Sequence, residues 1–150
     1  MGGDIMKRIF MILFIVLLSA TMQAQSFKAV CVGVNWDEGE NCAADAVTMR
    51  NYLINKLGWD EDNVECETNG DATKIAIESA IESITDNQYN YCLYFHASHG
   101  WDNPRYILSG NLPSNNSISP YNLQSWFGSH QRYCIFIDAC FSGDFILSLT

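Results

Sequence analysis

A cysteine and a histidine in this 150-residue sequence each follow closely after a short apolar run. Residues 91–95 (YCLYF) lead to His99, and residues 133–137 (YCIFI) lead to Cys140. A cysteine thiolate is a strong nucleophile, and a neighbouring imidazole can take the thiol proton and later protonate a leaving amine. If the two runs are neighbouring strands of one sheet, their ends bring the thiol and the imidazole together. The pair then predicts nucleophilic catalysis.

Gly100, directly after His99, adds a second feature of the same chemistry. A residue without Cβ lets a backbone N–H approach a carbonyl oxygen closely, so the N–H groups of Gly100 and Cys140 could form an oxyanion hole. Each feature alone is common, because an isolated cysteine after a strand is usually a buried apolar residue and an isolated His-Gly pair is usually a turn. Their joint placement after two apolar runs favours the catalytic interpretation.

Metal binding by His96, His99 and a cysteine is the competing chemistry. No Cys-x-x-Cys or His-x-x-x-His pair accompanies the two histidines, which lie in an extended segment. We therefore predict neither a zinc site nor a cofactor. His96 is expected at the end of its strand, packed beside the site.

Apolar strands and amphipathic helices alternate along the chain and must position these residues. The two helices with the clearest buried stripes carry Ala46, Met49, Leu53 and Leu57, and Ile75, Ile77, Ala80, Ile81 and Ile84, respectively. Gly58 is expected to end the first of them. Successive β-α-β units predict an α/β fold with a parallel sheet covered on both faces, whose functional groups collect at the carboxyl ends of the strands. We predict strands at 29–34, 63–68, 91–95 and 133–137 and helices at 41–57, 71–84 and 119–126. The polar stretch at 102–119 is predicted as a loop, with a small hairpin as the alternative.

The N-terminus has the pattern of an export signal. Lys7 and Arg8 precede an apolar run at 9–18, and the small residue Ala24 precedes a cleavage point. The run is shorter than the roughly 20 residues that cross a bilayer, so a cleaved signal peptide at 1–25 is favoured over an uncleaved membrane anchor. Met6 is an alternative start. The remaining domain, 26–150, is then expected to be secreted or periplasmic, without stable membrane insertion.

Charge and cysteine content narrow the function classes further. The formal net charge is −9 and no basic cluster follows the first few residues, which argues against a nucleic-acid partner. Six cysteines in an exported protein suggest disulfides. However, Cys31, Cys92 and Cys134 lie inside apolar runs, where cysteine commonly acts as a small buried side chain. Cys42 and Cys66 lie outside such runs, but we do not predict a bridge between them.

Three segments together resemble the caspase-like cysteine peptidases, and the metacaspase branch most closely. YFHASHG at 94–100 is similar to that family's strand ending in Ser-Gly-His-Gly, with Ser98 in place of the usual glycine. IFIDACFSG at 135–143 is similar to its strand ending in Asp-x-Cys-x-Ser-Gly. VGVN at 32–35, followed by CAADA at 42–46, resembles its opening strand and helix, with Ala44 in place of asparagine. Caspases proper carry Gln-Ala-Cys at the nucleophile, unlike this chain.

The resemblance implies a caspase-hemoglobinase-like three-layer αβα sandwich and a His99–Cys140 dyad. It also implies that Asp45 and Asp138 line a specificity pocket, with Cys42 on its wall. Two carboxylates repel one another when the pocket is empty and favour a guanidinium or ammonium group. We therefore expect cleavage of proteins or peptides after Arg or Lys. The competing interpretations are a helix N-terminal charge for Asp45 and a solvated strand-end carboxylate for Asp138.

Some features of the family do not transfer. Its sheet continues beyond the nucleophile strand, whereas this chain stops at Thr150 in an apolar stretch, so we expect a domain truncated at its C-terminus. Many metacaspases respond to calcium, but only Asp144 lies in the corresponding region, and calcium activation is not predicted. Two rival hypotheses remain open, which are a non-catalytic peptide-binding protein of this fold and an inactive fragment.

Overall fold

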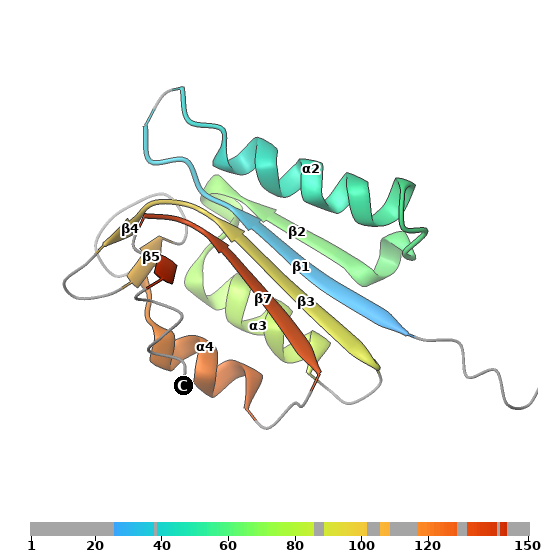
Figure 1. The fold of residues 1–150 in the computed structure, drawn as a ribbon. Coiled ribbons are helices and arrows are strands. Elements are labelled where there is room, and N and C mark those ends of the chain that lie inside the picture. The colour runs from blue at the N-terminus through green and yellow to red at the C-terminus, as the bar shows by residue number, and fades with distance from the viewer. Residues whose placement is uncertain are drawn as a thin grey trace, which may run out of the picture.

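The chain forms a three-layer α/β sandwich, with a sheet between helices on either side (Figure 1). The computed structural model describes residues 26–37, 39–85, 89–101, 106–108, 117–128, 132–140 and 142–143. The predicted signal peptide at 1–25 lies outside the described residues, and the export that it implies therefore stays a prediction. The elements in chain order are β1 (Phe27–Gly33), α2 (Cys42–Asn55), β2 (Val64–Thr68), α3 (Lys74–Ile84), β3 (Tyr91–Ala97), β4 (Gly100–Trp101), β5 (Tyr106–Leu108), β6 (Ser117–Ile118), α4 (Pro120–Phe127) and β7 (Tyr133–Asp138).

The main sheet has the strand order β2-β1-β3-β7, and all its pairs are parallel, as predicted. Gly33 of β1 pairs with Ala97 of β3, and Ala97 pairs with Asp138 of β7. The carboxyl ends of β1, β3 and β7 are therefore level with one another. Groups that follow these three strands must emerge at one edge of the sheet.

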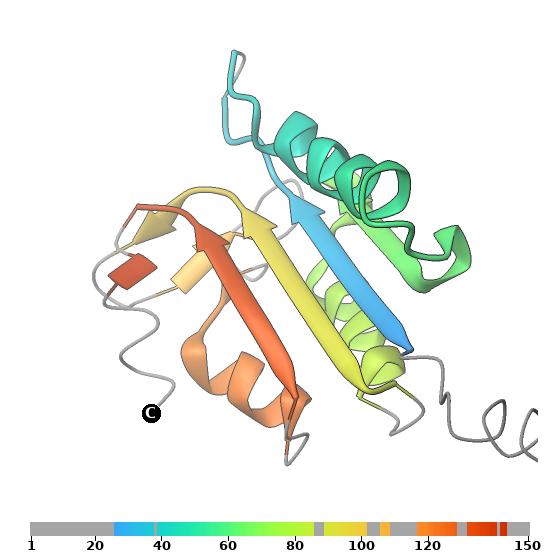
Figure 2. The same ribbon diagram turned by 45° about the vertical axis from the view of Figure 1, so that its right-hand side comes forward.

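Two apolar clusters hold the layers together. On one face, α2 lies over β1 and β2, and its Ala46 and Leu53 pack with Cys31 and Phe95 of the sheet. On the other face, α3 and α4 cover the sheet, as Figure 2 shows most clearly. Each fully buried apolar side chain contributes about 1.5–3 kcal/mol relative to exposure. The buried side chains of this second cluster include Val30, Val32, Ile77, Ile81, Ile84, Tyr94, Leu123 and Phe127.

The helix boundaries follow from local capping. Thr73 caps α3, since its hydroxyl accepts a hydrogen bond from the Ala76 N–H at 3.2 Å. Ser119 caps α4 in a capping box, with Pro120 in the first turn as predicted. Beyond α2, Gly58 has a φ of 72° and its N–H donates to the Ile54 carbonyl at 3.2 Å. These local signals explain why the predicted ends of the helices lie within two or three residues of the observed ends.

Several predicted burials were wrong. Leu57 is 53% exposed because α2 ends at Asn55 and leaves it in the following turn. Ile75 is 76% exposed, since it lies in the first turn of α3 on the side away from the sheet. Cys134 is also exposed, unlike Cys31 and Cys92. It lies on the α2 side of β7, which no described helix covers.

A second, antiparallel sheet of β4, β5 and β6 lies in the region predicted as a loop. Most of 102–116 lies outside the described residues. The six cysteines are free thiols, including Cys42 and Cys66. None of the helices in the part of the chain that the structure describes has both the length and the hydropathy of a membrane-spanning segment.

Candidate active site

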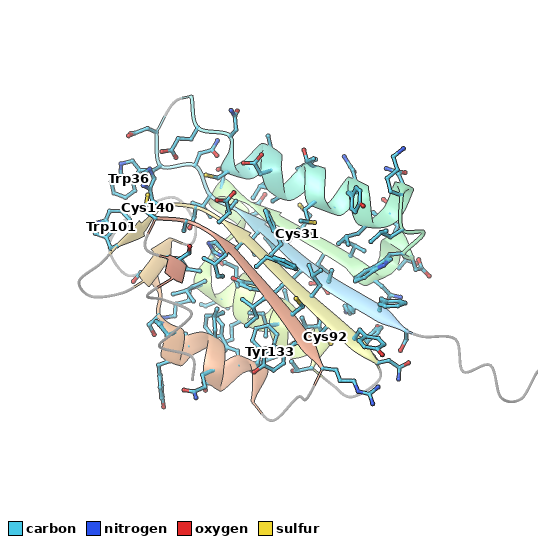
Figure 3. All side chains as sticks on the ribbon, in the orientation of Figure 1. Cys31, Trp36, Cys92, Trp101, Tyr133 and Cys140 are labelled. Carbon is cyan, nitrogen blue, oxygen red and sulfur yellow. The ribbon has the colours of Figure 1, made fainter. Side chains whose placement is uncertain are left out.

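Cys140 and His99 line the same cavity, of about 460 Å³, at the carboxyl ends of β3 and β7. Figure 3 shows Cys140 at this end of the sheet, beside Trp36 and Trp101. Cys42, Asp45 and Asp138 line the cavity too, so five of the six site residues predicted from the sequence meet there. Among the described residues, the cavity is lined by Glu40, Asn41, Cys42, Asp45, Ser98, His99, Asp138, Ala139 and Cys140.

The strand register explains why His99 and Cys140 line the same cavity. Ala97 and Asp138 are paired at the ends of β3 and β7, and the ladder continues for one more bond, from the Ser98 N–H to the Asp138 carbonyl at 3.1 Å. His99 and Cys140 are each the second residue after these paired ends. Parallel neighbours with equal offsets emerge side by side.

Gly100, the sixth predicted residue, packs against the backbone of Cys140. A Cβ on Gly100 would lie 2.0 Å from the carbonyl oxygen of Cys140 and 3.4 Å from the Cβ of Ala139. No side chain other than hydrogen fits such a contact. Glycine is therefore required here to let β4 approach the Cys140 peptide, a packing reason that sequence analysis did not anticipate.

The N-terminus of α2 is held directly on the end of β1. A Cβ on Gly33 would lie 2.3 Å from the Cys42 carbonyl oxygen, so glycine is needed for this approach. The side-chain oxygen of Asn35 accepts a hydrogen bond from the Ala43 N–H at 2.9 Å, and caps the helix from outside it. The amide oxygen of Asn69 in turn accepts from the Asn35 N–H at 3.0 Å. These contacts position Cys42 and the residues that follow it over the cavity.

The cavity is acidic, and more so than sequence analysis predicted. Asp45 and Asp138 are joined by Glu40, from the loop between β1 and α2, and none of the described residues that line the cavity is a lysine or an arginine. The pKa of the Cys42 thiol responds to these negative charges. Burial raises its pKa, and the negative charges of Glu40, Asp45 and Asp138 raise it further. A cationic side chain entering the cavity would relieve the mutual repulsion of the carboxylates.

Glu40 also makes a direct contact with the predicted acid/base residue. Its Oε1 accepts a hydrogen bond from Nε2 of His99, and the two form an ion pair when the imidazole is protonated. Its Oε2 accepts from the backbone N–H groups of Trp36, at 2.5 Å, and Asp37, at 3.4 Å. The Trp36 hydrogen bond is the main cause that lowers the pKa of Glu40. Sequence analysis missed Glu40 because an acidic residue in a polar loop carries no signal of a partner that lies 59 residues away.

Two indole rings lie together beside the His99 ring. The ring centroids of Trp36 and Trp101 lie 6.1 and 6.0 Å from that of His99, and 5.2 Å from one another. The three rings form one aromatic cluster, in which the two indoles pack beside the imidazole that lines the cavity.

A buried hydrogen-bonded chain supports the backbone of His99. The Ser98 hydroxyl donates to the His99 carbonyl at 3.0 Å, so its oxygen accepts from Nε2–H of His96, also at 3.0 Å. Nδ1 of His96 then accepts from the Tyr94 hydroxyl at 2.7 Å. Burial raises the pKa of Tyr94, which keeps this phenol a donor. The donor directions assign the neutral Nε2–H tautomer to His96.

His96 is therefore placed differently from its prediction. It lies inside β3, which extends two residues beyond the predicted end, and it is fully buried. It reaches the cavity only through Ser98. Among the described residues, no group of three or more histidine, cysteine or acidic side chains has the arrangement of a metal site.

Replacing His96 by phenylalanine is expected to destabilise the protein by about 1–3 kcal/mol, because the Tyr94 hydroxyl loses its buried acceptor. Urea unfolding followed by circular dichroism measures this change. The double variant His96→Phe/Tyr94→Phe should be less destabilised than the sum of the single variants, since both remove one shared hydrogen bond. Additive losses would show that the chain does not act as a unit.

Comparisons with known proteins add no family assignment. A scan of the sequence against protein-family models finds no match, and a search of the curated proteins finds none. The functional interpretation therefore rests on the residues of the chain and their geometry.

Proposed function

We propose that this protein is an exported cysteine endopeptidase of the caspase-like class, which cleaves peptide bonds after Arg or Lys. One observation carries the proposal, which is that a cysteine and a histidine from neighbouring parallel strands share a cavity with three carboxylates. The thiol and imidazole account for the reaction, and the carboxylates account for the selectivity. The resemblance of the three sequence segments to metacaspases agrees with both.

The proposed reaction begins with proton transfer from the Cys140 thiol to His99. The thiolate sulfur attacks the scissile carbonyl carbon, and the N–H groups of Gly100 and Cys140 stabilise the resulting oxyanion. The tetrahedral intermediate collapses, the C–N bond breaks, and the imidazolium of His99 protonates the leaving amine. Water, deprotonated by the same imidazole, then hydrolyses the thioester and restores the thiol.

Substrate preference follows from the charge of the cavity. Asp45 lies in the first turn of α2 and Asp138 ends β7, so carboxylates face the cavity from two elements. A planar guanidinium can donate N–H hydrogen bonds to both carboxylates, and an ammonium group can pair with them as a point charge. An acidic substrate side chain would meet like charges instead, which costs several kcal/mol. Arginine or lysine is therefore the expected residue before the cleaved bond.

Fluorogenic peptides ending in Arg, Lys or Asp test the proposal. The protein should release the fluorophore from the Arg and Lys peptides with kcat/KM at least about 100-fold above the Asp peptide. Asp138→Asn should lower kcat/KM for the Arg peptide by about 10- to 100-fold, because a charge-assisted hydrogen bond contributes about 1.5–3 kcal/mol. The Asp peptide should not be cleaved more slowly by this variant.

Asp62→Asn is the matched control, since it removes the same charge from an exposed 3-10 turn that does not line the cavity. Selectivity that is unchanged in Asp138→Asn would show that this carboxylate does not bind the substrate. Binding of the Arg peptide without turnover would support the rival hypothesis of a non-catalytic peptide-binding protein.

A further inference from the structure

We propose that Glu40 is a positioning residue for His99, so that the proposed catalytic unit is Cys140–His99–Glu40 rather than a dyad. This inference rests on the proposed function. Oε1 of the Glu40 carboxylate accepts a hydrogen bond from Nε2 of the His99 imidazole. Nδ1 is thereby left as the ring nitrogen that exchanges a proton with Cys140.

The carboxylate of Glu40 is held on both sides. While Oε1 contacts His99, Oε2 accepts the N–H groups of Trp36 and Asp37, at 2.5 and 3.4 Å. The Glu40 N–H closes the same turn by donating to the Asp37 carbonyl at 3.4 Å. A side chain tied in this way loses little conformational freedom when it orients its partner. The turn thus acts as a fixed support for one ring nitrogen.

Partial burial strengthens the contact. The side chain of Glu40 is 24% exposed and that of His99 is 38% exposed, so both lie partly out of water. Trp36 belongs to the same turn, and its indole lies edge-on to the His99 ring at 68°. The turn therefore places the Glu40 carboxylate against Nε2 of His99 and the Trp36 indole beside the same imidazole ring. Both interactions restrict the orientation of the imidazole ring.

Glu40 could instead serve only as a third carboxylate for the substrate cation, because it lines the cavity with Asp45 and Asp138. The two roles differ kinetically. Loss of a substrate contact raises KM, whereas loss of His99 orientation and charge lowers kcat.

The kinetic test compares Glu40→Gln and Glu40→Asp with the unaltered protein on the Arg peptide. Glu40→Gln should lower kcat by about 10- to 100-fold with KM nearly unchanged. This loss is smaller than the about 10²–10⁴-fold that a general acid–base group contributes by itself, because Glu40 acts only through His99. Glu40→Asp should retain an intermediate kcat, since it keeps the charge on a shorter side chain.

Glu61→Gln is the matched control, because Glu61 is exposed and pairs with Arg50 away from the cavity. It should keep kcat and KM. A Glu40→Gln variant with raised KM and unchanged kcat would overturn the proposal and identify Glu40 as a substrate-binding carboxylate.

A spectroscopic test separates this inference from the proposed function. In histidine-labelled protein, His99 should show a downfield, hydrogen-bonded Nε2 proton by NMR, identified by its absence in His99→Gln. Glu40→Ala should lose this signal through exchange with water, while Glu61→Ala keeps it. If the signal depends on Glu40 but no peptide is cleaved, the contact stands and the peptidase assignment fails. A signal that survives Glu40→Ala overturns the inference whether or not the protein is a peptidase.

Discussion

Replacing Cys140 by alanine is expected to reduce turnover of the Arg peptide to background, a loss of at least about 10⁴-fold. The thiolate forms the covalent bond to the substrate in the proposed mechanism, and the methyl group of alanine has no nucleophilic atom to replace it. His99→Ala should cause a comparable loss, since the two residues act as one unit. The double variant should then be no slower than either single variant, which is the expected signature of a shared step.

Cys134→Ala is the matched control for this experiment. Cys134 is also an exposed thiol of the same chain, but it lies within β7 and does not line the cavity. Its replacement should leave kcat/KM within about twofold of the unaltered protein, as for a surface substitution. Residual turnover in Cys140→Ala that equals that of the unaltered protein would remove the peptidase proposal altogether.

Gly100→Ala is expected to lower kcat by about 100-fold or more. The added Cβ would lie 2.0 Å from the Cys140 carbonyl oxygen, and its contact is with backbone rather than with a side chain that could rotate away. The Cys140 peptide or β4 must therefore move by about an ångström, a displacement that can cost about 100-fold in rate when it misaligns a reacting group. The same strain should destabilise the fold by about 1–3 kcal/mol.

Gly143→Ala provides the comparison, because a Cβ at Gly143 would meet nothing within 4 Å and its φ lies outside the left-handed region. It should keep both activity and stability. Peptide turnover and urea unfolding measured on both variants distinguish the two positions. Normal kcat in a folded Gly100→Ala protein would show that the close approach to Cys140 is not needed for the site.

The sequence alone predicted the parallel α/β architecture because its signals are local. Each apolar run of four to six residues forms a strand, and caps such as Thr73 and Ser119 mark where helices begin. The juxtaposition of His99 and Cys140 was also predictable in outline. Parallel neighbouring strands place their carboxyl ends at one edge, so it needed only the assumption that β3 and β7 are adjacent.

The exposure of Cys134 and the burial of His96 were decided by tertiary structure. Both lie in strands that read as uniformly apolar, so alternation could not tell which face each side chain takes. No described helix covers Cys134, and hydrogen bonds to Tyr94 and Ser98 help to accommodate the His96 imidazole inside the core.

Local sequence thus determined which segments become strands and helices and which side chains emerge at their ends, since apolar runs and caps act within a few residues. Tertiary structure decided what those side chains meet. Glu40 reaches His99, and Gly100 contacts Cys140, because the ends of β1, β3 and β7 are level and the loops that follow them converge. No sequence pattern within the loops after β1, β3 and β7 predicts that convergence, because it depends on strand order and register, which are properties of the folded chain.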